Sequence, residues 1–325
     1  MKILVTGGAG YIGSFMVKEL LEREFKVTVV DSLERGHKEA VDKNANLIIG
    51  NLLDKKFVAD VFSGDNFGAV IHFAGLISMK ESMENPGKYF ENNVFASLNI
   101  LEEMKKRKMG KFVFSSTAGI YGNPVTVPIP EDHPKNPENA YGESKLMVEK
   151  ILSWYNKIYG IDFVSLRYFN ACGASLDGTM GEGHNPETHI IPNAINAILN
   201  NSKFLLYGDD YDTPDGTCIR DYIHVIDLVE AHMLALDKLT AESGGYFYNV
   251  GTGKGHSNKK VLSMIEEVTN KKLEIEITKR RPGDANSLIA DVSRIKKELN
   301  FEPRYSDLET IVKTAWGWHK KLASS

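Results

Sequence analysis

The sequence predicts an α/β fold, a doubly wound parallel sheet followed by a smaller α/β domain. The first half alternates short β-rich runs with amphipathic stretches, a pattern typical of a parallel sheet with helices on both faces. The predicted strands lie at 2–6, 26–31, 46–50, 68–73, 111–115 and 162–168. The predicted helices lie between them, at 12–23, 54–62, 88–107 and 142–159. Ligands bind such sheets at the carboxyl ends of the strands, so we expect the functional residues there.

The pattern changes after about residue 170. Residues 173–186 are rich in Gly, Asp and Asn, which predicts a long loop. Shorter elements follow, with helices at 189–200, 226–239, 257–269 and 306–320 and strands at 204–207 and 246–250. We expect one domain over 1–170 and a second over 171–325, with some segments of the second part returning to the first domain.

The composition excludes several classes of protein. A chain of 325 residues, 42% of them hydrophobic, can bury a sizeable core. Its net charge of −4 offers no electrostatic attraction for nucleic acid. No segment approaches the ~18 apolar residues of a membrane span. The first strand begins at residue 2, which leaves no room for a signal peptide. We expect neither a membrane nor a nucleic-acid partner.

The cysteines and histidines favour a cytoplasmic protein without a metal. Cys172 and Cys218 give no disulfide framework, which fits a reducing compartment. None of the nine histidines pairs with a cysteine or another histidine at a spacing typical of zinc ligands. His184 and His189 lie in the predicted loop. We therefore expect no metal.

The most informative segment is a cluster of glycines behind the first strand. Gly7, Gly10 and Gly13 directly follow the apolar run at 3–5. Glycines at a strand-to-helix turn allow the backbone to approach a pyrophosphate, and the N-terminus of the next helix then faces that anion. Similar glycine density also occurs in plain loops. The second strand ends in Asp31, 18 positions after Gly13, where an acid meets the adenosine ribose in dinucleotide-binding folds.

Asp31 also bears on the choice of cofactor. A carboxylate at this place disfavours a 2′-phosphate, so the sequence favours NAD over NADP. Arg35 lies nearby and could accept such a phosphate, or it could be a solvated loop charge.

A second motif, Tyr141-Gly-Glu-Ser-Lys145, opens the helix predicted over 142–159. Residues four apart share a helix face, so Tyr141 and Lys145 project together. A phenol with a pKa of ~10 is a poor base, but a nearby ammonium and the positive nicotinamide of oxidised NAD would favour the phenolate. Such pairs also occur by chance on surface helices. After a dinucleotide motif, the pair predicts a tyrosine that moves a proton.

Three hydroxyls, those of Ser115, Ser116 and Thr117, end the strand that begins at residue 111. They can cap the chain as it leaves the sheet. Alternatively, one of them hydrogen-bonds a reacting hydroxyl beside Tyr141.

Ten segments, spread over nearly the whole chain, carry a resemblance to a known family. They are Val-Thr-Gly-Gly-Ala-Gly-Tyr-Ile-Gly at 5–13, His-Phe-Ala-Gly at 72–75, Asn-Asn-Val at 92–94, Ser-Ser-Thr-Ala at 115–118, Tyr-Gly at 121–122, Tyr-Gly-Glu-Ser-Lys at 141–145, Arg-Tyr-Phe-Asn at 167–170, Asp-Gly-Thr at 215–217, Arg-Asp-Tyr-Ile-His-Val at 220–225 and Arg-Arg-Pro-Gly-Asp at 280–284. With them the chain resembles the extended short-chain dehydrogenase/reductase family, which contains NAD-dependent epimerases and dehydratases on a Rossmann fold. The segments at 215–225 and 280–284 resemble the sugar-nucleotide epimerases in particular.

The resemblance implies a role for each matching residue. The residues implied to bind NAD are Gly7, Gly10, Tyr11, Ile12, Gly13, Asp31, Asn51, Leu52, Phe73, Ala74, Gly75, Asn92, Ser115, Tyr141, Lys145 and Tyr168. The catalytic residues would be Tyr141, Lys145 and Thr117. The residues implied to bind a UDP-hexose are Thr117, Asn170, His189, Arg220, Arg281 and Asp284. Without the resemblance, either arginine would be taken as a surface charge.

The implied activity is 4-epimerisation of UDP-galactose and UDP-glucose in galactose metabolism. Tyr141 would remove the proton of the sugar 4-OH with help from Thr117, and a hydride would pass to tightly bound NAD and return to the other face of a 4-keto sugar. A UDP-N-acetylhexosamine or another UDP-sugar is an alternative substrate. A dehydratase or decarboxylase is less favoured because Ala118 and Gly119 stand where those relatives carry acids. A non-catalytic NAD-binding protein is the remaining alternative.

Three positions depart from the family pattern. Ile77 stands where many relatives have a lysine near the cofactor phosphate, and Asn51 replaces an acid near the adenine. Leu288 is neither the bulky tyrosine nor the small residue found there in relatives, which leaves N-acetylated substrates open. The family also implies a homodimer in which the helices at 88–107 and 142–159 pair across the interface.

Overall fold

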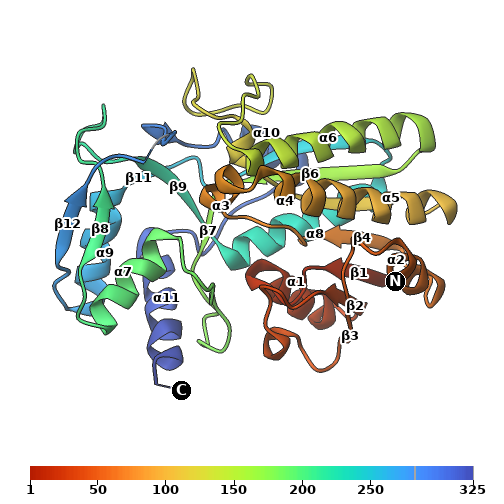
Figure 1. Cartoon of the computed structure of the whole chain (residues 1–325), viewed down its shortest axis with the longest axis horizontal. Helices are drawn as coiled ribbons and strands as arrows, with labels where there is room; N and C mark the ends of the chain where they lie inside the picture. The colour runs from red at the N-terminus through yellow and green to blue at the C-terminus, as the bar shows by residue number, and fades with distance from the viewer. Residues whose placement is uncertain (282, 325) are drawn as a thin grey trace. The chain divides into compact units, whose positions relative to one another are not determined.

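The computed structural model describes residues 1–281 and 283–324. The chain forms two compact units, each assembled from separate segments (Figure 1). Unit 1 consists of Met1–Tyr121, Lys135–Arg167 and Val229–Tyr248. Unit 2 consists of Gly122–Pro134, Tyr168–Leu228 and Asn249–Ser325.

Unit 1 is organised around a seven-stranded sheet in the order β10-β6-β5-β4-β1-β2-β3. The strands are β1 (Lys2–Thr6), β2 (Lys26–Asp31), β3 (Asn46–Ile49), β4 (Ala69–His72), β5 (Lys111–Thr117), β6 (Asp162–Tyr168) and β10 (Gly245–Val250). The ladders of β1 with β2, β1 with β4, β2 with β3 and β4 with β5 are parallel. The predicted doubly wound sheet is thereby confirmed.

The helices of this fold begin and end at residues that favour helix termini. They are α1 (Tyr11–Glu22), α2 (Lys55–Ser63), α3 (Met79–Glu84), α4 (Pro86–Tyr89), α5 (Ala96–Lys106), α6 (Ala140–Tyr159) and α8 (Val225–Ala241), with short turns η1 (Lys38–Ala40) and η3 (Ala118–Ile120). The Asp54 side chain caps α2, and the Asn139 side chain caps α6 by accepting from Gly142 N. Gly160, with φ of 69°, ends α6 in the left-handed region.

One predicted helix is subdivided in the structure. The stretch predicted at 88–107 consists of α4, a π-helical turn η2 (Phe90–Phe95) and α5. The extra residue of a π-turn is a local irregularity that periodicity does not reveal. It brings Asn93 into the core of unit 1, where its side chain is buried.

The core of unit 1 lies on both faces of the sheet. Leu4, Val30 and Phe112 pack with residues of α2, α5 and α6 in one buried cluster. Val29 points to the opposite face, because successive strand residues alternate. Val29 lies against Gly8 together with Val17, so α1 covers that second face.

Unit 2 contains two small sheets. One has the order β11-β9-β13, with β7 also pairing β9, and the other joins β8 to β12. Its strands are β7 (Asn170–Cys172), β8 (Phe204–Tyr207), β9 (Ile219–His224), β11 (Gly255–Ser257), β12 (Ile275–Thr278) and β13 (Ser287–Leu288). Its helices are α7 (Ile190–Leu199), α9 (Asn258–Thr269), α10 (Ser293–Leu299) and α11 (Leu308–Leu322). Figure 1 shows α7 and α9 beside β8 and β12. Buried residues of α7, α9, α11 and β8 form one cluster.

Several elements of unit 2 were not predicted, namely β7, β9, β11, β12, β13 and α10. β9 carries Arg220 and a fully buried Asp221, so it lacks the apolar alternation of a strand. Across the two ranges that the structure describes, none of the helices combines the length and the apolar character that crossing a membrane requires.

Candidate active site

The glycine turn between β1 and α1 is closely packed. Gly7 has a φ of 73°, and a Cβ there would lie 2.5 Å from Ala74 N. A Cβ on Gly13 would lie 2.1 Å from the main-chain oxygen of Gly7. At Gly10 the nearest atom would be 3.4 Å away, which is an ordinary contact. The turn therefore cannot form with a side chain at Gly7 or Gly13. At Gly10 there is room for one, so the backbone of the turn is uncovered there, above the start of α1.

Asp31 is held at the end of β2 by main-chain groups. Its carboxylate accepts from Ala9 N at 3.0 Å and from Leu33 N at 2.9 Å. Arg35, the alternative cation, lies 3.5 Å from Glu81 in an ion pair. Asp31 is thus fixed in the place expected for an acid that binds a ribose, while the charge of Arg35 is shared with a glutamate.

Lys145 is a residue of α6, and its side chain is buried. Its Nζ donates to the main-chain oxygen of Ser115 at 2.9 Å and lies 5.0 Å from the centre of the Phe114 ring. Burial lowers the pKa of Lys145 to about 8. A Cβ on Gly75 would come within 3.3 Å of the Lys145 Nζ, so the glycine there gives the ammonium room.

Tyr141 differs from the expectation. Burial raises its pKa, and a hydrogen bond with Thr117 opposes that rise. The predicted lowering by the ammonium of Lys145 is not found in the protein alone, because desolvation of the phenolate is the larger effect. A lowered pKa at Tyr141 therefore requires positive charge from a bound molecule.

Thr117 has the capping role considered for the hydroxyls that end β5, and it also contacts Tyr141. Its Oγ1 accepts from Gly119 N at 3.0 Å and so caps the turn η3. It also hydrogen-bonds Tyr141. Ser116, by contrast, donates to Glu149 at 2.7 Å and faces the core.

Glu149 is a residue of α6 that the motif did not include. Its Oε1 accepts from Ser165 Oγ at 2.8 Å and from Arg167 Nε at 2.9 Å, and its Oε2 accepts from Arg167 Nη2 at 2.7 Å. Arg167 Nη1 also donates to Tyr121 at 3.0 Å. The sequence did contain one signal for Glu149, its spacing. Residues 141, 145 and 149 recur every four residues and so lie on one helix face.

Asn93, also missed, supports the helix from another side. It accepts from Leu76 N at 2.8 Å and donates to Ser144 Oγ at 2.9 Å, which connects the π-turn to α6. The predicted cofactor residue Asn92 donates to Asn93 Oδ1 at 3.2 Å. Asn93 thus fixes its neighbour as well as the helix that carries Tyr141.

The remaining predicted cofactor residues follow the carboxyl ends of strands, as expected for this sheet. They are Tyr11 and Ile12 after β1, Asn51 and Leu52 after β3, Phe73, Ala74 and Gly75 after β4, Ser115 in β5, and Tyr168 at the end of β6. Tyr168 belongs to unit 2, and the others belong to unit 1.

The predicted substrate residues, apart from Thr117, belong to unit 2. Arg220 on β9 donates to the main-chain oxygens of Ile219 at 2.9 Å and Ala285 at 2.8 Å. Its Nη2 lies 3.4 Å from Asp284 Oδ1. The structure therefore pairs two residues to which the sequence gave separate roles. Asn170, on β7, donates to the main-chain oxygen of Asp221, the residue after Arg220, at 2.9 Å.

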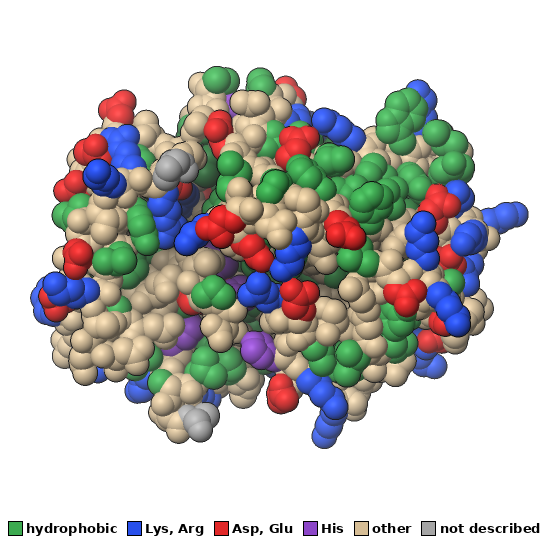
Figure 2. All heavy atoms as spheres, viewed as in Figure 1, with side chains coloured by type: hydrophobic (Ala, Val, Ile, Leu, Met, Phe, Trp, Pro, Cys, Tyr) green, Lys and Arg blue, Asp and Glu red, His purple; other side chains and the backbone are tan. Residues whose placement is uncertain are grey.

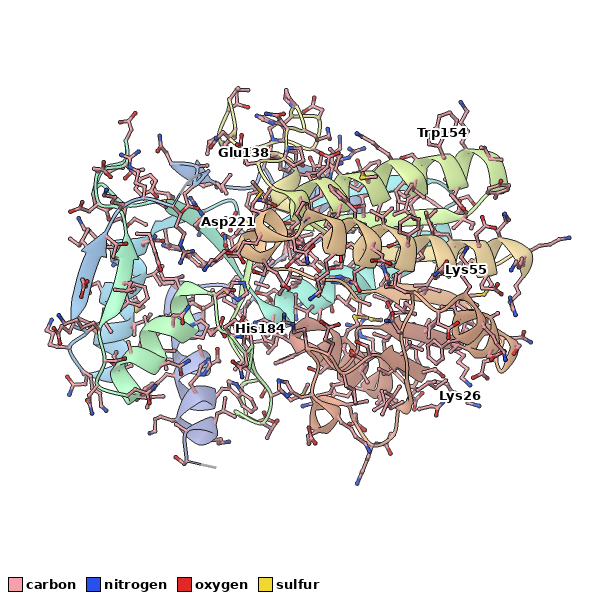
Figure 3. The ribbon with its side chains drawn as sticks, in the orientation of Figure 1. Lys26, Lys55, Glu138, Trp154, His184 and Asp221 are labelled. Atoms are coloured by element: carbon pink, nitrogen blue, oxygen red, sulfur yellow. The ribbon has the colours of Figure 1, made fainter. Side chains whose placement is uncertain are left out.

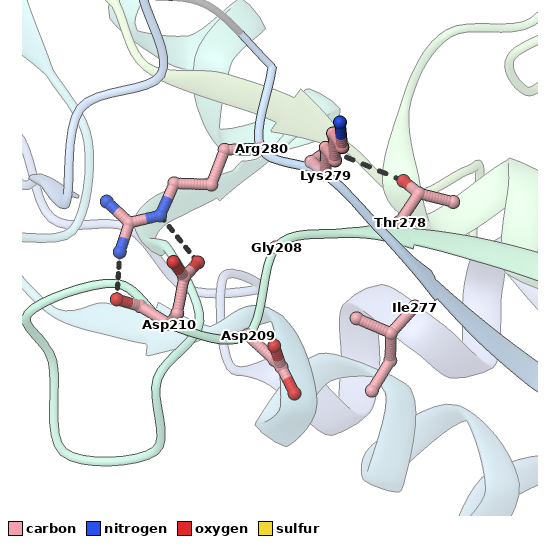
Figure 4. Close-up of a pocket in the computed structure, with 7 residues that line it drawn as sticks. All are labelled: Gly208, Asp209, Asp210, Ile277, Thr278, Lys279 and Arg280. Atoms are coloured by element: carbon pink, nitrogen blue, oxygen red, sulfur yellow. Dashed lines mark hydrogen bonds and ion pairs between the residues drawn. The ribbon is translucent and has the colours of Figure 1, made fainter.

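Arg281 and Arg280 are neighbours with different surroundings. The guanidinium of Arg281 lies 3.9 Å from the centre of the Tyr207 ring. Arg280 instead borders a hollow at the end of β8 and β12, where its Nε donates to Asp210 at 2.6 Å (Figure 4). Tyr207, which sequence reasoning missed, thus orients the arginine that was predicted to bind the substrate. Pro282 of the same motif lies outside the described residues.

His189 stands at the N-cap of α7, and its Nδ1 contacts the buried carboxylate of Glu182. His184 and Glu187 converge on the same place, a cluster that was not expected from the sequence. The two histidines have the spacing H-x4-H, which lies within the range of zinc ligands. The expectation that no histidine pair has such a spacing was therefore wrong for this loop.

The departures from the family pattern lie at accessible positions. The Ile77 side chain, after β4, is 47% exposed. Leu288 on β13 is paired in register with Arg220 on β9 and is partly exposed.

The chain is similar to known proteins over nearly its whole length. The chain is 45% identical to the UDP-glucose 4-epimerase of Lacticaseibacillus casei over 321 residues, 98% of this chain and 97% of that protein. A crystal structure of a UDP-glucose 4-epimerase matches the fold with a TM-score of 0.97 at 45% identity, covering 100% of this chain and 99% of the other. The enzyme from Bifidobacterium longum in complex with NAD+ and UDP matches with a TM-score of 0.93 at 35% identity, covering 99% and 98%.

The family model described as the NAD dependent epimerase/dehydratase family matches residues 3–251. That range contains the glycine turn, Asp31, Thr117 and the Tyr141–Lys145 pair, and it is more than half of the chain. The chain therefore belongs to the NAD-dependent epimerase/dehydratase family.

Proposed function

We propose that this chain is a UDP-glucose 4-epimerase that interconverts UDP-galactose and UDP-glucose with a tightly bound NAD. The observation that carries the proposal is the hydrogen bond between Tyr141 and Thr117, on a helix that also carries the buried Lys145. Near full-length relatives of that name, at 44% to 46% identity, support the same activity.

The residues of unit 1 fit NAD. Gly7 and Gly13 pack too closely for any side chain, and Gly10 leaves the start of α1 uncovered for a pyrophosphate. Asp31, already fixed by Ala9 N and Leu33 N, has the chemistry to accept from ribose hydroxyls. When bound, NAD supplies the hydride acceptor and later the hydride donor of the reaction.

Tyr141 is the proposed acid and base. It would take the proton of the sugar 4-OH as the hydride leaves C4, and it would return that proton after the 4-keto sugar has presented its other face. Lys145, whose pKa is about 8, is mostly protonated at neutral pH. Its ammonium would stabilise the phenolate together with the positive charge of bound oxidised NAD. Thr117 orients the phenol and the 4-OH.

The residues of unit 2 are proposed to bind UDP rather than the hexose. A guanidinium matches the paired oxygens of a diphosphate, which suits Arg220 and Arg281. Asp284 would bind the uridine ribose, and Asn170 and His189 the phosphates. Firm binding of UDP with few bonds to the hexose would let the sugar turn between the two hydride transfers.

A dehydratase or decarboxylase is disfavoured by the residues after Thr117. Ala118 and Gly119 form the turn η3 and offer no carboxylate for elimination or decarboxylation. Leu288 leaves acceptance of N-acetylated UDP-hexoses as a separate question.

The test is incubation of the purified protein with UDP-galactose, followed by NMR of the product. We expect UDP-glucose to form without added NAD and with NAD still bound to the protein. A stable keto or deoxy sugar would contradict the proposal, as would NAD binding without any epimerisation.

We also propose that the protein is a cytoplasmic homodimer that serves galactose metabolism. Figure 2 shows hydrophobic side chains gathered over α6, and Figure 3 shows Trp154 pointing away from that helix. Trp154 and Ile158 are exposed to 58% and 59%. Sedimentation should give a dimer at micromolar concentration, and Trp154→Lys should favour the monomer. A monomeric unaltered protein would contradict this part of the proposal.

A further inference from the structure

The loop that leads into α7 gathers four side chains able to bind a metal. Glu182, His184, Glu187 and His189 each offer one donor atom, and these atoms lie within 4.8 Å of one another. His184 Nδ1 lies 2.9 Å from Glu182 Oε1 and 4.0 Å from Glu187 Oε1. His189 Nδ1 contacts the same oxygen of Glu182 and lies 3.6 Å from Glu187 Oε1. The four donors converge on one small volume rather than forming two separate pairs.

The burial of the two carboxylates argues for a compensating charge. The side chains of Glu182 and Glu187 are only 4% and 9% exposed. Buried carboxylates are stable only when a cation or a hydrogen-bonded partner offsets their loss of hydration. The ion-pair partners here are imidazoles, which are also common metal ligands.

We propose that Glu182, His184, Glu187 and His189 bind a Zn²⁺ ion at a structural site. Two imidazole nitrogens and two carboxylate oxygens make the four-ligand, mixed nitrogen and oxygen set that zinc accepts in tetrahedral geometry. Mg²⁺ and Ca²⁺ prefer oxygen ligands and higher coordination numbers, so the two imidazoles disfavour them. With side chains in all four positions, no position remains for water or substrate, which is typical of a structural site.

The surroundings of the cluster fit such a role. The main-chain oxygen of Glu182 accepts from Trp318 Nε1 of α11 at 2.7 Å. Glu187 Oε1 accepts from Thr188 N at 2.7 Å and from His189 N at 2.9 Å. Such outer contacts orient metal ligands. The ion would connect Glu182, whose main-chain oxygen is held by α11, to His189, the residue directly before α7.

The inference shares His189 with the proposed UDP site, where the imidazole would use Nδ1 for the ion and keep Nε2 for a phosphate. No step of the epimerase reaction uses the ion. The test is therefore metal content and stability rather than turnover. Full-length protein purified without chelators or a metal-affinity column should contain zinc in an equimolar amount. Removal of the zinc with dipicolinate should lower the Tm, and added Zn²⁺ should restore it, because a ligand bound only to the folded state stabilises that state. Mg²⁺ should not restore the Tm.

Substitutions identify the ligands. His184→Gln and Glu182→Gln should each weaken zinc binding by more than about 100-fold, since even outer-shell changes cost metal sites about 10- to 100-fold. His256→Gln, at a histidine of unit 2 outside the cluster, should keep the zinc content of the unaltered protein. Co²⁺ in place of zinc should give the visible absorption of a four-coordinate ion, and H184Q should lose it.

The chelator experiment uses the unaltered protein. It therefore tests the inference even if a substitution in the cluster prevents folding. Zinc-free protein whose Tm does not respond to Zn²⁺ would overturn the inference, and the cluster would then consist of histidine–glutamate ion pairs only. Equal zinc binding by H184Q and the unaltered protein would overturn it as well. Epimerase activity in a protein whose Tm does not respond to Zn²⁺ would overturn this inference and leave the proposed function standing.

Discussion

Glu149 and Arg167 form a buried ion pair that connects α6 to β6, with Arg167 Nη2 donating to Glu149 Oε2 at 2.7 Å. Glu149 lies eight residues after Tyr141 on the same helix face, about 12 Å along the axis. The pair therefore fixes the helix that carries both catalytic side chains, without touching the reacting atoms.

Glu149→Gln should destabilise unit 1, because Arg167 would keep a buried charge without its counter-ion. The expected loss is about 3 kcal/mol in the free energy of unfolding, measured with urea. As a positioning residue, Glu149 should also affect kcat more than KM. Glu84→Gln removes an exposed ion pair with Lys80 on α3 and should cost less than about 1 kcal/mol. Equal stability of the two variants would contradict the role given to Glu149.

Tyr141→Phe should lower kcat by about 10²- to 10⁴-fold while NAD stays bound, since only the proton-transferring hydroxyl is removed. Turnover with UDP-galactose and the NAD content of the purified variant are the measurements. Appreciable activity in this variant would assign the proton transfer to another group.

Thr117→Val should move the acid limb of the pH profile of kcat to higher pH. The hydrogen bond from Thr117 lowers the pKa of Tyr141, so without it the phenolate forms at higher pH. Thr117→Ser retains the hydroxyl and should keep the original profile. A profile unchanged in T117V would mean that this bond does not tune the base.

Substitutions at two glycines should distinguish a role in folding from a role in cofactor binding. Gly13→Ala places a Cβ 2.1 Å from the Gly7 oxygen and should destabilise unit 1. Gly10→Ala meets its nearest atom at 3.4 Å and should leave the Tm of the cofactor-free protein nearly unchanged while weakening NAD binding. Calorimetric titration with NAD distinguishes the two effects. Unaltered NAD affinity in G10A would remove Gly10 from the proposed pyrophosphate site.

His72 should make the protein sensitive to mild acid. Burial lowers its pKa to about 3, with the charge of Lys145 adding to the effect, while an unfolded histidine has a pKa near 6.5. Below pH 6.5 the folded state thus binds fewer protons than the unfolded state. The free energy of unfolding therefore decreases as the pH falls from about 6.5 toward 3. At pH 5.5 the loss expected from His72 is about 1.4 kcal/mol, measured with urea, and the acid loss of His72→Asn should be smaller by that amount. Buried His224 accounts for acid loss that remains, because its pKa is lowered to about 4. His37→Asn, at an exposed histidine, should behave like the unaltered protein, and an acid loss as large in H72N as in the unaltered protein would contradict the prediction.

Much of the sheet could be predicted because local sequence determines it. The strands from β1 to β6 are β-rich runs separated by amphipathic stretches. The turn after β1 needs glycine for steric reasons, and glycines can be recognised directly in a sequence. Tyr141 and Lys145 could be paired from helix geometry alone. The identity of the UDP-binding residues came from family resemblance, and their binding roles remain predictions.

The rest depends on contacts between distant residues. Arg220 is fixed by the main-chain oxygen of Ala285, 65 positions later, and no local pattern announces that contact. Glu149 resembles an exposed helical glutamate until Arg167 is placed beside it. The pKa of Tyr141 could not be predicted either, because the effect of burial depends on the packing around the phenol.

The position of β10 has a consequence for biosynthesis. β10 is the outermost strand of the seven-stranded sheet, next to β6, yet it is encoded at Gly245–Val250. A nascent chain that has emerged only as far as β6 therefore presents an unpaired strand edge, and such edges can pair with other chains. Until the ribosome delivers the last strand, we expect this intermediate to depend on chaperones that shield it from aggregation.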